Sequence, residues 1–135
     1  MSGRRLADVA EGDELPALDV PITTTAIVAG AIASRDYQDV HHDPELARQR
    51  GSKDVFMNIL TTNGYVGRFV TDWAGPDAVL KKVAIRLGAP NYPGDTMHMS
   101  GRVTGKGDGG RVDVEIRGAN SLGDHVVGTV SLVLP

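Results

Sequence analysis

The chain has 135 residues, a formal net charge of -3, no cysteine and only 4% aromatic residues. This length predicts one domain, and the lack of cysteine excludes disulfide frameworks, thiolate metal sites and cysteine nucleophiles. The mild acidity argues against nucleic acid as a partner, and no apolar run is long enough to cross a membrane. Because residues 1–16 carry acids and lack an apolar signal segment, we expect a cytoplasmic protein.

The chain begins with segments of little regular pattern. Residues 1–14 are polar and small, which is typical of a loose N-terminal arm. Residues 15–24 combine two prolines with mixed apolar residues, which predicts an irregular or edge strand because proline cannot donate to a central ladder.

Helical patterns follow. Residues 25–36 are rich in alanine and predict a first helix, with Thr24 or Thr25 as its N-cap. An Asp-Pro pair and a later glycine bound a short second helix over residues 43–51. Residues 58–73 carry apolar side chains at spacings of three and four, which predicts a long helix.

Two glycines lie inside the long predicted helix. Gly64 and Gly67 each cost roughly 1 kcal/mol relative to alanine at such positions. We therefore expect another element to pack closely against the helix face that carries them.

Alternating patterns dominate the rest of the chain and predict four antiparallel strands joined by glycine-rich turns. Met97 and Met99 are expected to fill the core, His98 to lie on a sheet face and His125 to be exposed. One half-buried sheet and one long helix predict an α+β domain, residues 1–135, in which the sheet curls around the helix. The predicted strands cover residues 79–87, 96–103, 111–117 and 126–134.

The connection between the first two helices is dense in ionisable groups. Asp36 and His41 lie five residues apart in it, so both can point at one spot. A carboxylate beside an imidazole suits acid–base work on a water molecule. On their own, the same two residues could equally be solvated loop residues. A metal site at His41, His42 and Asp43 is not expected, because no further ligand has a suitable spacing.

Residues 34–45, S-R-D-Y-Q-D-V-H-H-D-P-E, resemble the hydratase motif of the MaoC-like dehydratase family. That motif runs approximately Gly-Asp-X-Asn-Pro-X-His and is followed shortly by Asp-Pro. Asp36, His41 and the Asp-Pro pair match it, and the resemblance extends over about residues 15–134. Three positions depart from the family's Gly, Asn and Pro, namely Arg35, Gln38 and Asp39.

The resemblance implies a hot-dog fold and hydration of trans-2-enoyl-CoA thioesters to 3-hydroxyacyl-CoA. Asp36 and His41 would be catalytic, with His41 as the main proton carrier, and backbone N–H groups at the start of the central helix would bind the thioester oxygen. Gln38, Met57 and Asn58 would contact substrate, although Met57-Asn58 replaces the His-Gly pair that is usual there. No metal and no cofactor are implied, since CoA is part of the substrate.

Sites of this family usually lie where two hot-dog units pair, so the resemblance implies a homodimer or a heteromer with a second hot-dog subunit. The short chain is most similar to small subunits of actinobacterial hydratases that act on steroid side-chain CoA esters. Two alternatives remain. An acyl-CoA thioesterase would need a carboxylate on the central helix, where only Asp72 is available. A non-catalytic hot-dog subunit would only complete a partner's acyl-CoA tunnel or scaffold a complex.

Overall fold

The computed structural model describes residues 3–135, and the helices and strands follow the predicted order. Short 3-10 turns lie at Leu6–Asp8, Asp39–His41 and Asp108–Gly110. The three α-helices are α1 (Thr24–Ala33), α2 (Pro44–Gln49) and α3 (Ile59–Ala74). The strands are β1 (Leu18–Pro21), β2 (Val79–Leu87), β3 (Thr96–Lys106), β4 (Arg111–Asn120) and β5 (Gly123–Val133).

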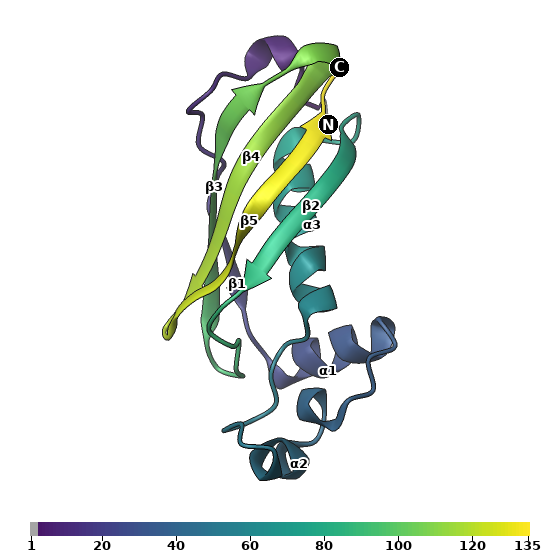
Figure 1. The fold of residues 1–135 in the computed structure, drawn as a ribbon, viewed down its shortest axis with the longest axis vertical. Coiled ribbons are helices and arrows are strands. Elements are labelled where there is room, and N and C mark those ends of the chain that lie inside the picture. Colours follow the sequence, from purple (N-terminus) through teal and green to yellow (C-terminus); the bar gives the residue numbers. More distant parts are fainter. Residues whose placement is uncertain (1–2) are drawn as a thin grey trace.

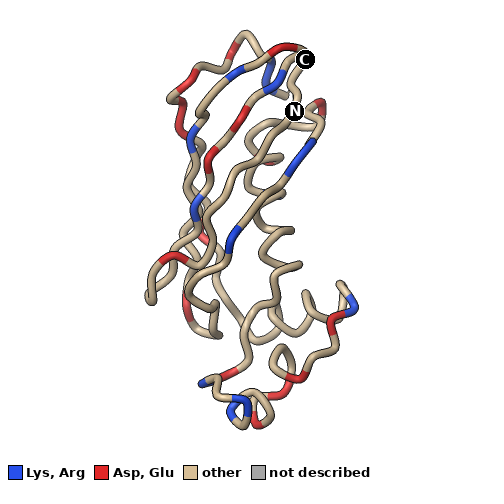
Figure 2. Tube along the Cα trace, in the orientation of Figure 1, with Lys and Arg blue, Asp and Glu red and all other residues tan. Residues whose placement is uncertain are grey.

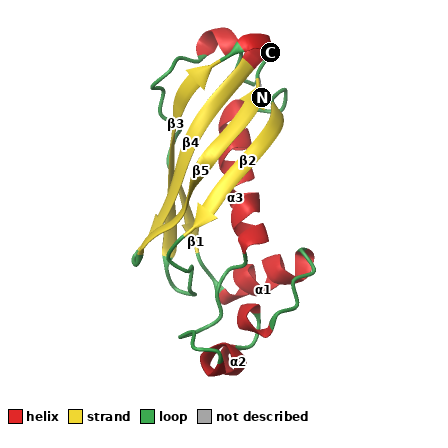
Figure 3. Cartoon of the chain, viewed as in Figure 1, coloured by secondary structure: helices red, strands yellow, loops and turns green. Residues whose placement is uncertain are grey.

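The strands form one five-stranded antiparallel sheet in the order β1-β3-β4-β5-β2. The sheet curves along α3, whereas α1 and α2 lie beyond the end at which α3 begins (Figure 1; Figure 3). The predicted α+β hot-dog arrangement is confirmed. Residues 15–24 contribute the edge strand β1, as their prolines suggested, and β2 forms the other edge.

The core lies between the concave face of the sheet and α3. Strand β4 shows why, because Val112, Val114 and Ile116 alternate with polar residues and are buried. Met97 and Met99 are buried beside them, as expected. Charged residues alternate with buried ones along β4. They recur along the strands and around α2, whereas α1 carries none (Figure 2).

Helix starts are set by local capping. Asp43 accepts a hydrogen bond from the N–H of Leu46 at 3.1 Å and Pro44 occupies the first turn of α2, as predicted. The cap of α1 differs from the expectation. Thr23, not Thr24 or Thr25, is in an extended conformation, and its hydroxyl accepts from the N–H of Ala26 at 3.0 Å.

Residues 3–14 do not form the loose arm predicted for residues 1–14, of which residues 1–2 lie outside the described part of the chain. The side chain of Val9 is buried in the core. The N–H of Leu6 donates to the carbonyl of Pro135 at 2.8 Å. The Lys106 ammonium donates to the carbonyls of Leu6 and Val9 at 2.9 and 2.7 Å. Composition alone suggested a loose arm, because contacts between residues far apart in the sequence leave no local pattern.

The close helix approach occurs at a different glycine from those predicted. Within the described residues, a Cβ on Gly64 would meet nothing within 4 Å, and one on Gly67 would meet only Leu80 at 3.9 Å. A Cβ on Gly30 of α1 would lie 2.2 Å from the Thr61 hydroxyl of α3. Gly30 therefore permits α1 and α3 to pack, while Gly64 faces open space.

His98 and His125 behave differently from each other. His98 is exposed on the sheet, as expected, with its Nδ1 2.7 Å from a carboxylate oxygen of Asp19. His125 is buried, contrary to the expectation. Its Nδ1 donates to the carbonyl of Ala89 at 2.7 Å, and its Nε2 accepts from the Thr62 hydroxyl of α3 at 2.8 Å. These two partners satisfy both ring nitrogens, which allows burial.

Candidate active site

The C-terminal turn of α1 positions Asp36. Arg35 has a φ of 57°, in the left-handed region that glycine occupies at low cost. The N–H of Arg35 donates to the carbonyl of Ile32, and the N–H of Asp36 donates to that of Ala31. This turn reverses the chain just after the helix. The left-handed conformation explains why glycine suits the position that Arg35 occupies in the motif.

His41 lies in the Asp39–His41 turn and is 6% exposed. Its Nδ1 is 2.7 Å from the carbonyl oxygen of Phe56, and the Phe56 ring meets the imidazole edge-on at 5.0 Å. A carbonyl oxygen only accepts, so Nδ1 carries the proton. In the neutral imidazole, Nε2 is therefore the acceptor.

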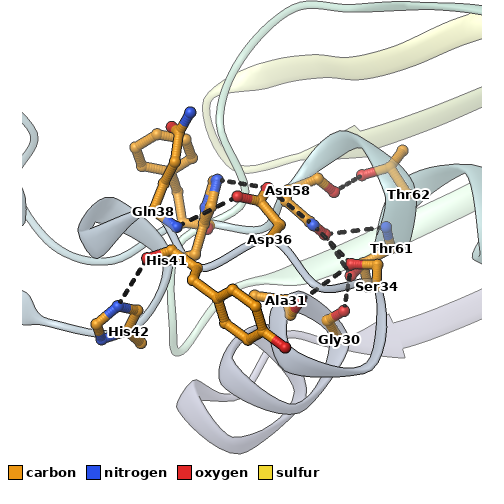
Figure 4. A network of polar contacts seen from close by, with 12 residues as sticks. Gly30, Ala31, Ser34, Asp36, Gln38, His41, His42, Asn58, Thr61 and Thr62 are labelled. Carbon is orange, nitrogen blue, oxygen red and sulfur yellow. Dashed lines mark hydrogen bonds and ion pairs between the residues drawn. The ribbon is translucent and has the colours of Figure 1, made fainter.

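The Nε2 of His41 points at Asp36, 3.3 Å from its Oδ2 (Figure 4). Both atoms are acceptors when the imidazole is neutral. A water molecule that donates one O–H to each of them satisfies both. When the imidazole is protonated, the Nε2–H instead faces the carboxylate directly. The pair can therefore hold a water and balance the charge that appears when the ring takes a proton.

Asn58 completes this cluster from the start of α3. Its Nδ2 donates to Oδ2 of Asp36 at 3.1 Å and to the Ser34 hydroxyl at 3.0 Å (Figure 4). The hydrogen bond from Asn58 is the largest of the influences that hold the pKa of Asp36 below its ordinary value. Partial burial opposes this shift, while the N–H of Gln38 and the charge of His41 add to it. Asp36 is thus ionised at neutral pH.

The structure brings Asp36, His41 and Asn58 together, but not Gln38 and Met57. The Gln38 residue is exposed, and only its backbone N–H reaches Asp36, at 3.3 Å from Oδ1. Met57 is buried in the core, where its sulfur is 3.7 Å from the Asn91 amide. Neither side chain joins the polar network of Asp36.

Sequence reasoning missed the supporting residues of the site. Ser34 and Thr61 bind the two ends of the Asn58 amide, and the carbonyl of Phe56 fixes the tautomer of His41. Ser34 stands in the motif segment, which was a usable signal. The others are set by tertiary contacts and leave no sequence pattern.

An open groove of about 380 Å³ runs beside the cluster. Ser34 belongs to both, because its hydroxyl contacts Asn58 and its side chain lines the groove. The groove is largely apolar, which suits a hydrocarbon group. Its lining includes Gly30, Ala33 and Ser34 on one side and Leu60, Gly64 and Tyr65 on the other.

Within residues 3–135 there is no group of three or more His, Asp or Glu side chains that could hold a metal ion. None of the helices described is long and apolar enough to cross a bilayer.

A curved antiparallel sheet around one helix, with a carboxylate–imidazole pair beside the start of that helix, defines a hot-dog protein with a candidate acid–base site. Comparison with protein families gives the more particular assignment. The MaoC like domain model matches residues 8–123. The chain belongs to the MaoC-like family.

Known proteins similar to this chain agree with that assignment. It is 52% identical over 121 residues to the 3-oxo-4,17-pregnadiene-20-carboxyl-CoA hydratase beta subunit of Mycobacterium tuberculosis (strain ATCC 25618 / H37Rv), covering 90% of this chain and 93% of the relative. In the crystal structure of the ChsH1-ChsH2 complex from Mycobacterium tuberculosis, one chain matches with a TM-score of 0.91 and 50% identity, covering 93% and 98% of the two chains.

A more distant structure shares the fold. The R-hydratase PhaJ1 from Pseudomonas aeruginosa, in its unliganded form, matches with a TM-score of 0.90 at 20% identity. The match covers 98% of this chain and 86% of the other.

Proposed function

We propose that this chain is the catalytic subunit of an enoyl-CoA hydratase that acts on a steroid side-chain acyl-CoA. The observation that carries the proposal is the convergence of Asp36 Oδ2 and His41 Nε2, 3.3 Å apart, beside an apolar groove. The 52% identity to a subunit of a pregnadiene carboxyl-CoA hydratase supports the choice of substrate class.

The chemistry follows from the protonation states. Asp36 and His41 each accept one O–H of a bound water. The water oxygen attacks C3 of the enoyl thioester while Nε2 of His41 takes one of its protons. The resulting imidazolium returns that proton to C2, so the substrate gains one water in total. Asp36 keeps the other O–H oriented and stabilises the transient charge on the ring.

Negative charge accumulates on the thioester oxygen during the attack. The first backbone N–H groups of a helix have no partner within it and carry partial positive charge. The first N–H groups of α3 lie close to Asp36. The side-chain oxygen of Asn58 already accepts a hydrogen bond from one of them, the N–H of Thr61. Backbone N–H groups at Asn58 and the residues just after it are the donors we assign to that oxygen.

We also propose that the active form contains a second hot-dog subunit. The groove beside the site is open on the side away from α1 and α3, and its α3 wall includes the exposed Leu60 and Gly64. A partner surface over this face would enclose the acyl group. The similar chain in the ChsH1-ChsH2 complex supports a heteromer rather than two identical chains.

The test uses the chain together with the hot-dog subunit that co-purifies with it. Loss of enoyl-thioester absorbance is followed with crotonyl-CoA and with 3-oxo-4,17-pregnadiene-20-carboxyl-CoA. We expect Asp36→Asn and His41→Ala to lower kcat by about 100-fold or more. Asp36→Asn removes the negative charge that stabilises the imidazolium, and His41→Ala removes the group that takes the proton from water. Circular dichroism checks that both variants fold.

Two neighbours serve as matched controls. Asp39 pairs with Arg50 and His42 is exposed, so Asp39→Asn and His42→Ala should retain turnover within a few-fold. Full turnover in both site variants would instead favour a non-catalytic subunit. The thioesterase alternative lacks support, since Asp72 lies near the far end of α3 and is exposed beside Arg68.

A further inference from the structure

The neighbours of Asn58 determine which end of its side-chain amide is the oxygen and which is the nitrogen. The N–H of Thr61 is a donor in any state, so the atom 3.0 Å from it must be the acceptor Oδ1. The hydroxyl of Thr61 donates to the same oxygen. Nδ2 must then face the other way, toward Asp36 and Ser34. A flipped amide would set oxygen against carboxylate and N–H against N–H.

This fixed amide acts on the reacting edge of Asp36. Nδ2 donates to Oδ2 at 3.1 Å, and Oδ2 is the oxygen that faces Nε2 of His41. Among the residues that the structure describes, the other oxygen, Oδ1, receives only the backbone N–H of Gln38. His41 is the titratable group in contact with Asp36, and the remaining contacts of the carboxylate are neutral.

The amide comes from an unexpected place. Gln38, which holds the motif position where the family has Asn, points its side chain to solvent. Asn58, which replaces a family Gly, reaches Asp36 from 22 residues away and is 2% exposed. A buried side chain that uses both amide ends is held more rigidly than an exposed one.

We propose that Asn58 is a positioning residue, whose side-chain amide holds Oδ2 of Asp36 toward Nε2 of His41. The amide thereby ties the start of α3 to the turn after α1. This role is separate from a backbone contact with substrate. The expected effect of Asn58 on the reaction rate rests on the proposed function. Its expected effect on the Asp36 carboxylate does not.

Two substitutions separate the amide's contact with Asp36 from its capping of α3. Asn58→Ser retains a good N-cap but is too short to reach Asp36. Asn58→Asp retains the shape and the cap but replaces the N–H donor by an acceptor. Thr23→Ala is the matched control, because it removes the equivalent cap of α1 without touching the site.

The first measurement is the titration of the Asp36 carboxyl carbon by NMR in the full chain, with Asp36→Asn used for assignment. The midpoint should move to higher pH in Asn58→Ser, further in Asn58→Asp, and not in Thr23→Ala. An unchanged midpoint in a folded Asn58→Ser protein would overturn the proposal.

The second measurement is the pH profile of hydration with the partner subunit present. We expect kcat to fall about 100-fold in Asn58→Ser with little change in KM, because the substitution misplaces a catalytic group. The acid limb of the profile should move to higher pH. If the midpoint moves in NMR while the wild-type complex does not hydrate enoyl-CoA, the positioning role stands and the proposed function fails. If the wild type hydrates and Asn58→Ser keeps both profile and midpoint, the positioning role fails alone.

Discussion

Arg35, in the turn that positions Asp36, has an unfavourable backbone conformation. Arg35 adopts a left-handed φ of 57°, which costs an L-residue roughly 1–2 kcal/mol relative to glycine. The turn that it makes brings the carboxylate of Asp36 back toward α3, where Asn58 receives it. The hydrogen bond from Asn58 thus stabilises a turn that the sequence of the turn itself disfavours.

His125 gives a prediction about stability and pH. Burial lowers its pKa, and the hydrogen bond to Ala89 opposes this only in part. The unfolded chain therefore binds this proton at a higher pH than the folded one does. The free energy of unfolding should rise with pH between the folded pKa and about 6.5, by up to about 1.4 kcal/mol per pH unit.

Urea unfolding at several pH values between 5 and 8 measures this slope. His125→Gln should flatten it, while Thr23→Ala, which removes no ionisable group, should leave it unchanged. Equal slopes in wild type and His125→Gln would show that the imidazole does not become harder to protonate on folding.

Some single-residue roles could be predicted from the sequence and others could not. Asp36 and His41 lie in one short segment, so their spacing allowed them to meet, and the family resemblance favoured it. The burial of His125 could not be predicted, because its partners Ala89 and Thr62 lie 36 and 63 residues away. The resemblance pointed to Asn58 as a substrate contact, but its contact with Asp36 depends on how α1 and α3 pack.

The two helices that meet at the site give a prediction from their glycines. Gly64 faces open space in the middle of α3, so Gly64→Ala should raise the free energy of unfolding of the isolated chain by about 1 kcal/mol. Gly30→Ala is the matched change in α1. It should lower that free energy, because the new Cβ would lie 2.2 Å from Thr61. Urea denaturation of both variants checks this, and destabilisation by Gly64→Ala would mean that its helix face is covered.

At the level of elements, local signals predicted more than long-range ones did. Alternation located the strands, and the Asp-Pro pair located α2, because both signals depend on adjacent residues. The strand order, with β5 inserted between β4 and β2, has no such signal. It results from the sheet covering α3 and burying the apolar faces of its strands.

The molecule as a whole divides into two ends. The site, α1 and α2 lie at one end, and the N-terminal segment lies at the other, beside the C-terminus (Figure 1). The N–H of Arg4 donates to the carbonyl of Ala74 at 2.9 Å, and its guanidinium lies 5.2 Å from the Trp73 ring centre. The segment therefore closes the C-terminal end of α3, while Asn58 and the motif turn surround its start.

This separation predicts that stability and activity can be changed independently. Deleting residues 1–10 removes the buried Val9 and the contacts of Arg4 and Leu6, and should lower the free energy of unfolding by roughly 2–4 kcal/mol. The site should be intact at the far end, so kcat with the partner subunit present should change less than two-fold at a temperature where the shortened chain is folded. Val9→Ala should reproduce part of the loss. An unchanged free energy of unfolding would mean that the segment is a loose arm, as its composition suggests. A large fall in kcat would show that the two ends are coupled through α3.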